Sequence, residues 1–479
     1  MSRRLPRAVR SLVVCVALLV SGCTGASTGA SHRASPVPEL TLAPGAARPG
    51  PTLPGDWLTY HHDPQRSGDV PGVPAPGVPV AAPASAGLRQ AWRAALDGAV
   101  YGQPLIVRGT VVAATEHDSV YGLDPATGRV RWHTSLGTPE PLSALPCGGI
   151  DPLGITGTPV YEPTTGLVFA VAELNGGRHV LVGLDPATGA VRVRREAEPP
   201  RGDRLAHQQR GALAAVDGRV LVTYGGLEGD CGNYVGSVVS VPATGAGPLV
   251  QYSVPTSRQG GIWAPGGPVV TPDGRVLVSV GNGAATHGAW DGSDSVVALS
   301  PGRLTVTGAF APTTWAQDNA EDLDLGSLTP ALVGDDVLAV GKRGTGYTLG
   351  LDTRLRRSGV GGEQAQARLC GAFGSAAVRA RTVFVPCPGE LLRVDVGLDG
   401  VPRPGWHVAL RAGGSPVLGG GAVWEPDYGA GTLLVIDQAS GRVLARLATG
   451  ALPHFASPVL SGDRLLIGTL AGVTAFTGA

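Results

Sequence analysis

The sequence predicts an all-β fold, an eight-bladed β-propeller of four-stranded antiparallel blades whose ring is closed by pairing of N- and C-terminal strands. Three observations predict it. A turn phrase recurs along the chain, and two further strand patterns precede most of its copies. The last repeat unit lacks one strand, which a segment near the start of the chain can supply. Each repeat unit therefore has the strand content of one propeller blade.

The turn phrase is "YGLDPATGRVRW" at 121–132, and it returns as "VGLDPATGAVRV" at 182–193. Apolar alternation ahead of Asp124 suits a strand, the Asp124 carboxylate can accept backbone N–H groups, Pro125 presets a turn torsion, and Gly128 supplies a positive φ. The chain therefore reverses there and starts a new outer strand. Weaker copies follow near Val241, Ser300, Asp352, Asp395 and Asp437.

The repeat units can be counted from these copies. Seven complete units begin near Ala99, Ile155, Gln209, Gly260, Asp324, Cys370 and Gly413. An eighth, from Pro453 to Ala479, has only three strands, and the segment "LRQAWRAAL" at 88–96 can supply the fourth. Joining the two ends in one blade removes the exposed edges of the ring. Trp92 and Trp132 then occupy outer-strand positions, where we expect them to pack between blades.

The first residues predict export. Four arginines and no acid stand within residues 1–10, and a short apolar run follows, so we interpret 1–22 as a signal peptide. The stretch "LLVSGC" at 18–23 resembles the lipobox of bacterial lipoproteins, which implies a diacylglyceryl group on Cys23 and a lipid anchor on the extracytoplasmic face of the bacterial cell membrane. The alternative is a secreted protein with a cysteine near its cleavage site.

Composition divides the rest of the chain in two. Residues 23–55 are dominated by Ala, Gly, Pro, Ser and Thr, which predicts a disordered tether after the lipidated cysteine. Residues 56–479 are predicted to form the propeller domain. Lys and Arg number 37 and Asp and Glu also 37, so the charge balance indicates no nucleic-acid partner.

Four cysteines remain once Cys15 is removed with the signal and Cys23 is lipidated. An even number in an exported chain favours two disulfides over free thiols, although four cysteines allow three pairings and two thiols could stay free. In an antiparallel hairpin the numbers of two opposed residues add up to a nearly constant sum, and a turn at Arg379 and Ala380 predicts a sum of 759. Cys370 and Cys387 give 757, a mismatch that a bulge or a longer turn absorbs. We therefore predict the disulfide Cys370–Cys387 and, by exclusion, Cys147–Cys231.

The phrase "LDPATGxVxW" resembles the pyrroloquinoline quinone (PQQ) type of repeat. That repeat occurs in eight-bladed quinoprotein dehydrogenases and in non-catalytic lipoproteins such as the outer-membrane assembly propeller. The resemblance covers nearly all of 56–479, and the opening "DWLTYHHDPQRSG" is also similar to the start of such chains. "DNAEDLDLGSLTP" followed by "GKRGTGYTLGLD" is similar to a segment of polyvinyl-alcohol-dehydrogenase-like members. The repeat is specific for fold and not for activity.

A dehydrogenase of this kind would need PQQ, a cation such as Ca²⁺ on oxygen ligands, a carboxylate to take the alcohol proton, and flat surfaces against the ring. The densest cluster that could supply them is "WAQDNAEDLDLG" at 315–326. The candidates are Asp318 as the catalytic carboxylate; Asn319, Asp322 and Asp324 as metal ligands; and Trp263, Trp315, Lys342 and Arg343 as ligand- or cofactor-binding residues. A purely structural interpretation is that these Asp and Asn side chains cap their own turns.

Two functions remain open. The chain lacks the pair of adjacent cysteines on which the family's dehydrogenases commonly stack their cofactor, and it lacks a C-x-x-C-H haem motif. We therefore favour a membrane-anchored binding or scaffold module whose propeller face binds a protein, a glycan or a small molecule. The alternative is a PQQ-dependent quinoprotein dehydrogenase that oxidises an alcohol or a sugar.

Overall fold

The computed structural model describes residues 38–47, 50–70 and 87–478. The chain divides into two units, Met1–Pro36 and Val37–Ala479, and every described residue belongs to the second. The signal peptide and Cys23 that the sequence predicts lie outside the described residues. No helix in the described ranges is long and apolar enough to cross a membrane.

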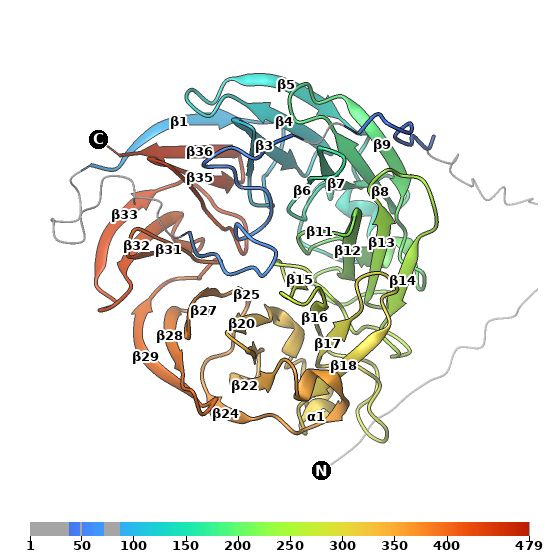
Figure 1. The fold of residues 1–479 in the computed structure, drawn as a ribbon, viewed down its shortest axis with the longest axis vertical. Coiled ribbons are helices and arrows are strands. Elements are labelled where there is room, and N and C mark those ends of the chain that lie inside the picture. Colours follow the sequence, from blue (N-terminus) through green and yellow to red (C-terminus); the bar gives the residue numbers. More distant parts are fainter. Residues whose placement is uncertain (1–37, 48–49, 71–86, 479) are drawn as a thin grey trace, which may run out of the picture. The chain divides into compact units, whose positions relative to one another are not determined.

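The second unit is an eight-bladed β-propeller, as predicted, and its colours run in order around the ring in Figure 1. Blades 1 and 2 are β2–β5 (Leu105–Val107, Thr110–Thr115, Ser119–Leu123, Val130–Ser135) and β6–β9 (Val160–Glu162, Leu167–Leu174, Arg178–Leu184, Val191–Glu196). Blades 3 and 4 are β11–β14 (Ala214–Val216, Arg219–Gly226, Ser237–Pro242, Val250–Ser253) and β15–β18 (Val269–Val270, Val276–Val280, Ser295–Leu299, Val306–Ala311).

Blade 5 combines β20–β22 (Ala331–Val333, Asp336–Val340, Thr345–Gly350) with β24 (Ala365–Arg368). Blades 6 and 7 are β26–β29 (Ala377–Arg379, Thr382–Cys387, Glu390–Val396, Pro402–Ala409) and β30–β33 (Val417–Gly419, Ala422–Asp427, Thr432–Asp437, Val443–Ala448). Blade 8 combines β34–β36 (Val459–Ser461, Arg464–Thr469, Gly472–Thr477) with β1 (Arg89–Ala95). The antiparallel pairing of β1 with β36 closes the ring, which confirms the prediction.

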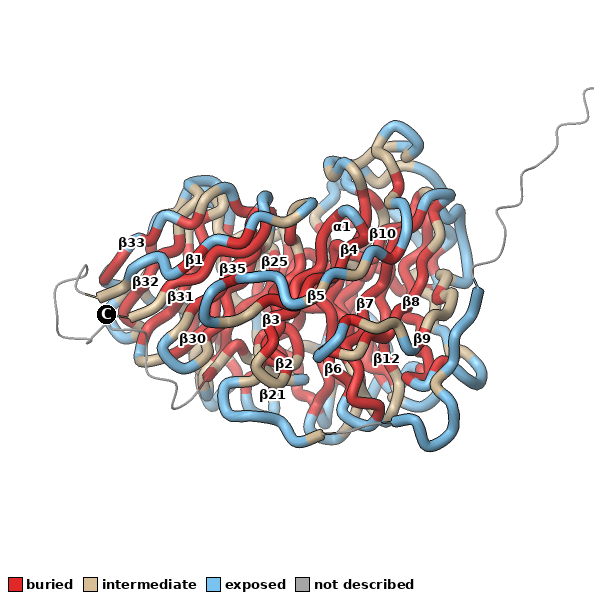
Figure 2. The backbone as a smooth tube through the Cα atoms, turned by 90° about the horizontal axis from the view of Figure 1, so that it is seen from above, coloured by how far each residue is buried: buried red, intermediate tan, exposed pale blue. Residues whose placement is uncertain are grey.

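Short elements decorate the blades. The only α-helix of the described residues is α1 (Trp315–Glu321), and four 3₁₀ turns are η1 (Leu142–Ala144), η2 (Arg204–Ala206), η3 (Leu325–Ser327) and η4 (Arg354–Arg356). Four short strands pair outside the regular blades: β10 (His207–Gln208) with β12, β19 (Leu328–Thr329) with β25 (Gly374–Ser375), and β23 (Ser358–Val360) in parallel with β18. Burial follows the strands, whereas loops and outer edges are exposed (Figure 2).

The recurring turn phrase has a second role that the sequence analysis missed. Its turn is as predicted: Asp124 accepts the amides of Ala126 and Thr127 at 3.0 and 2.9 Å, and Gly128 has φ +71°. The Trp92 indole Nε1, from the preceding blade, donates to the Pro125 carbonyl at 3.1 Å and packs over Gly128. This turn therefore also seats the outer-strand tryptophan of the neighbouring blade.

The same seat recurs twice. Trp132 donates to the Pro186 carbonyl at 3.1 Å above Gly189, and Trp406 donates to the Gln438 carbonyl at 3.2 Å above Gly441. In each case a Cβ on the glycine would overlap the indole. Glycine is thus required by contact as well as by backbone conformation.

Part of the predicted tether lies against the propeller. Leu40 exchanges two backbone hydrogen bonds with Arg194 of β9, at 2.9 and 2.8 Å, and the Leu42 amide donates to the Thr244 carbonyl at 2.8 Å. The expectation of disorder for 23–55 therefore does not hold for this stretch. An outer strand has unpaired backbone groups, and this extended segment satisfies some of them.

Residues 56–70 close one end of the central channel. Their backbone hydrogen-bonds to the inner strands of blades 1, 2, 4, 6 and 7. The buried Arg66 guanidinium donates to three backbone carbonyls, those of Tyr60, Leu213 and Pro268, at 2.9 to 3.2 Å. This segment opens the part of the chain that the sequence assigns to the propeller, and it joins most of the blades at their inner edges.

Candidate functional site

A cavity of about 550 Å³ lies at the other end of the channel. Several of its wall residues lie shortly before inner strands of different blades, and inner strands surround a propeller axis; these residues are Tyr101, Arg210, Trp263, Phe373 and Phe455. The wall comprises Tyr101, Gln208, Arg210, Trp263, Asp322, Asp324, Lys342, Phe373, His454, Phe455 and parts of the loops 145–153 and 226–230. Because residues 56–70 occupy the channel beyond it, a ligand would enter from the face that carries these loops.

Lys342 and two of the predicted metal ligands meet in this cavity. The Lys342 Nζ lies 2.7 Å from Asp322 Oδ1 and 2.8 Å from Asp324 Oδ2. Asp324 is buried and also accepts the Asn282 amide at 2.5 Å, whereas Asp322 is exposed and ends α1 in the left-handed region at φ +56°. Burial raises the pKa of Asp324, and Lys342 offsets part of that effect. Burial alone would lower the pKa of Lys342, but the two carboxylates raise it above its ordinary value.

The other members of the predicted cluster lie outside the cavity wall. Asp318 on α1 is buried, forms an ion pair with Arg343 and accepts the Thr314 hydroxyl at 2.8 Å. Burial raises the pKa of Asp318, while these two partners lower it. Trp315 is buried at the start of α1. The structure therefore separates Asp318, Arg343 and Trp315 from Trp263 and Lys342.

The Asn319 side chain forms its hydrogen bonds with a neighbouring loop. Its Oδ1 accepts the Gly283 amide at 2.5 Å, and its Nδ2 donates to the Ala285 carbonyl at 2.6 Å and to Ser293 Oγ at 2.8 Å. These bonds hold the loop 283–293 against α1. They give Asn319 a structural role, although it does not cap its own turn as the structural interpretation had it, and they leave the amide oxygen already in use.

The residues present do not fit PQQ with a calcium ion. Among the His, Cys, Asp and Glu side chains of the described residues, only Cys370, Cys387 and Glu390 bring three ligand atoms within 4.8 Å of one another, and the two cysteines share a disulfide. Asp322 and Asp324 are paired with Lys342, so a cation there would have to displace an ammonium. PQQ itself carries three carboxylates, and the wall offers one further cation, Arg210. Trp263 does line the cavity, where its ring offers the flat surface that a quinone ring would need.

Sequence reasoning missed Arg210. This side chain is only 9% exposed, and its Nη2 donates to the His454 carbonyl at 3.0 Å. The guanidinium carbon lies 5.5 Å from the Tyr101 ring centre and 5.2 Å from that of Phe455. Burial lowers the pKa of Arg210, and the charge of Glu116 raises it. Its position directly before an inner strand, shared with Trp263, was the available signal.

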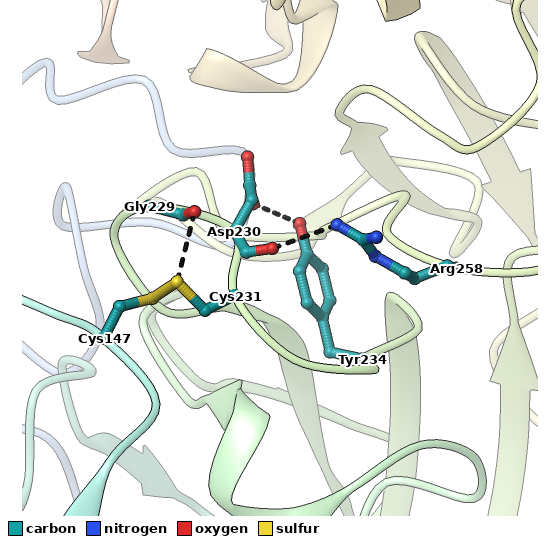
Figure 3. The surroundings of a disulfide bond; sticks show 6 residues. All are labelled: Cys147, Gly229, Asp230, Cys231, Tyr234 and Arg258. Atoms are coloured by element: carbon teal, nitrogen blue, oxygen red, sulfur yellow. Dashed lines mark hydrogen bonds between the residues drawn. A yellow bond between two sulfur atoms is a disulfide. The ribbon is translucent and has the colours of Figure 1, made fainter. Parts of the chain in front are cut away.

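The disulfide Cys147–Cys231 joins two loops of the cavity wall, as predicted, with Cα atoms 5.9 Å apart. Figure 3 shows Gly229 and Asp230 next to Cys231. Both residues line the cavity. The Asp230 carboxylate accepts the Tyr234 hydroxyl, and its backbone carbonyl accepts Arg258 Nη2 at 3.2 Å. The disulfide therefore links the blade 1 and blade 3 sides of the cavity wall.

The disulfide Cys370–Cys387 is also present, but the predicted reason for it was partly wrong. The hairpin pairs Arg379 with Thr382, so its turn lies one residue later than expected. Cys387 belongs to β27, whereas Cys370 precedes β26 in the loop that leads into the blade. The bridge thus links a strand to that loop and does not cross the first two strands.

Comparisons with known proteins agree with this architecture. The family model described as outer membrane protein assembly factor BamB matches residues 79–297. A comparison with curated proteins gave no match. Quinohemoprotein alcohol dehydrogenase from Comamonas testosteroni has a similar structure at 16% identity and a TM-score of 0.69, over 88% of this chain and 80% of that one.

Two further solved structures share the fold. BamB from Moraxella catarrhalis aligns at 17% identity and a TM-score of 0.57, over 81% of this chain and 99% of that one. A europium-containing methanol dehydrogenase aligns at 15% identity and a TM-score of 0.65, over 89% and 98%. At these identities the likeness shows the fold alone. The repeat phrase, the family model over residues 79–297 and the eight blades together support the assignment of this chain to the PQQ-like β-propellers.

Proposed function

We propose that this chain is an exported lipoprotein whose propeller is a non-catalytic binding module, with the central cavity as its ligand site. The observation that carries the proposal is the pairing of Lys342 with both Asp322 and Asp324 in that cavity, which commits the carboxylates that a quinone-bound cation would need. A volume of about 550 Å³ falls within the range of small-molecule sites. Of the partners considered, a small molecule fits it best.

The test of the binding function compares it directly with the dehydrogenase alternative. The full chain, purified in a non-ionic detergent, is incubated with PQQ and Ca²⁺, freed of unbound quinone, and assayed for quinone absorbance and for dye reduction with alcohols and sugars. We expect no dye reduction that depends on both additions. Turnover requiring PQQ and Ca²⁺ would refute the non-catalytic proposal.

A lysine variant makes this test sharper. Lys342→Met frees Asp322 and Asp324 from their ion pairs. If the pairing is what keeps a cation out, calcium titration should detect binding to the variant and none to the wild type. Calcium binding of equal strength in both proteins would contradict this reasoning.

The lipid anchor is a separate part of the proposal. Disulfides are typical of proteins outside the cytoplasm, and the two in this chain support export. We expect Cys23→Ala to abolish labelling by a radioactive fatty acid and to remove the processed protein from the membrane fraction. Cys15→Ala, within the proposed signal peptide, is the matched control and should leave labelling intact. Unchanged labelling of the Cys23 variant would refute the anchor.

A further inference from the structure

We propose that the cavity binds a small organic acid through a single carboxylate, which Arg210 holds, with a flat apolar body against the aromatic wall. This inference rests on the proposed function of the cavity as a ligand site. It adds the chemical class of the ligand and the residue that selects it.

Arg210 has unused hydrogen-bonding capacity that faces the cavity. Among the described residues, its one hydrogen-bond acceptor is the His454 carbonyl, and no carboxylate lies within ion-pair distance of its guanidinium. The other guanidinium nitrogens are not among the enclosed, unsatisfied atoms of the described chain, so they remain accessible from the cavity that Arg210 lines. A guanidinium presents its donors in a planar fork that matches the two oxygens of a carboxylate.

The energetic setting also favours an anion. A cation that is nine-tenths buried without a paired counter-ion is costly. The nearby Glu116 carboxylate accepts the Gly154 amide at 2.8 Å and the Thr156 hydroxyl at 3.1 Å, both through Oε2, while its Oε1 has no hydrogen-bond partner among the described residues. Glu116 forms no ion pair with Arg210, and burial raises its pKa to about 7, which weakens it as a counter-ion. A ligand carboxylate would therefore supply the counter-charge and the acceptors that the protein leaves out.

The rest of the wall limits the ligand to one negative charge. Lys342, the other cation of the wall, is already paired with two carboxylates. Glu228 and Asp230 also line the cavity, and neither forms an ion pair with a described residue. A second anionic group on the ligand would meet these acids without a cation to offset them. The site therefore discriminates against dianions and trianions.

The apolar part of the wall indicates the shape of the ligand body. Trp263, Phe373, Phe455 and Tyr101 all line the cavity, and the ring centres of Trp263 and Phe455 lie 6.3 Å apart. Aromatic side chains offer large flat contact areas and prefer ring geometries of this kind. An aromatic monocarboxylate combines both requirements.

The experiment uses the full chain in a non-ionic detergent and four matched probes: benzoate, benzamide, benzylamine and phthalate. Ligand-observed NMR titration gives a dissociation constant for each. We expect benzoate to bind at least about tenfold more tightly than neutral benzamide or cationic benzylamine, and more tightly than the dianion phthalate. Equal or tighter binding of benzamide, benzylamine or phthalate would overturn the inference, and so would an absence of benzoate binding.

Variants then locate the selecting residue. Arg210→Met should remove the preference for benzoate over benzamide, whereas Arg446→Met, at an exposed arginine of the outer strand β33 and outside the cavity wall, should leave it unchanged. Because the first variant could fold poorly, Arg210→Lys is included and should keep a weakened preference. Glu228→Gln should increase the affinity for phthalate relative to the affinity for benzoate. A preference that survives in Arg210→Met would refute the role of Arg210.

Failure of this inference is distinguishable from failure of the proposed function. Benzamide or benzylamine binding as tightly as benzoate leaves the cavity a ligand site and overturns only the ligand class. Dye reduction that depends on PQQ and Ca²⁺ overturns the non-catalytic function, whatever the probes show.

Discussion

Substituting alanine for Gly189 tests the seat between blades 1 and 2. Gly189 has φ +71°, and a Cβ built there would overlap the Trp132 indole. Gly274 is a matched control, since it has φ +83° in a hairpin turn and no atom within 4 Å of a Cβ. Both variants bear the strain of a left-handed alanine, about 1 kcal/mol.

Only Gly189→Ala should lose more free energy of unfolding than this backbone strain accounts for. Displacing the indole costs about 1–3 kcal/mol as overpacking, and losing the hydrogen bond from Trp132 to the Pro186 carbonyl costs about 1 kcal/mol. We therefore expect the free energy of unfolding to fall by about 3–5 kcal/mol for Gly189→Ala and by about 1 kcal/mol for Gly274→Ala.

Equilibrium unfolding in guanidinium, followed by circular dichroism and by fluorescence, measures both losses and checks that the two probes coincide. Repeating Gly189→Ala in a Trp132→Ala background isolates the indole contact, because the alanine should then cost only its backbone strain and its contact with the Thr134 hydroxyl. Equal destabilisation by Gly189→Ala and Gly274→Ala, or an unchanged cost without the indole, would refute the seat as an energetic feature.

The remaining predictions concern the disulfides and one buried acid. In the loop-entropy description, replacing Cys147 and Cys231 by serine, which opens a separation of 84, should cost about 4.6 kcal/mol, against about 3.1 kcal/mol for Cys370 and Cys387 at 17; a larger loss for the second pair in denaturant unfolding would contradict this ranking. Glu425 is fully buried, and burial raises its pKa well above its ordinary value, with a smaller effect from a neighbouring carboxylate. A carboxyl group whose pKa is raised in the folded state favours folding fully below pH about 4.5, and this contribution is lost as the pH rises towards the folded pKa. The free energy of unfolding of Glu425→Gln should therefore rise relative to that of the wild type, by up to about 1.4 kcal/mol per pH unit above pH about 4.5. A stability difference that does not change between pH 4 and pH 7 would show that Glu425 is not the titrating group.

Parts of the site could be predicted from the sequence and parts could not. Trp263, which the sequence analysis named as a ligand- or cofactor-binding candidate, lies shortly before an inner strand and lines the cavity. The same signal was present at Arg210 but was not used, since an isolated arginine in a loop carries no motif. Asp318 and Lys342 were named as candidates for one site, yet Asp318 on α1 pairs with Arg343 and lies outside the cavity wall.

The sequence by itself determined the number of blades and the closure of the ring, because strand alternation and turn chemistry are local and repeat in register along the chain. It also predicted the cysteine pairing that the structure has, although the hairpin used in that argument turns one residue later. The tertiary structure alone decided what converges on the axis. Residues 56–70 fill one end of the channel, and Arg210, His454 and Trp263 meet at the other from blades far apart in the chain. No local pattern encodes these meetings, since they depend on the rotation of each blade about the axis and on which side chains the ring brings within reach of one another.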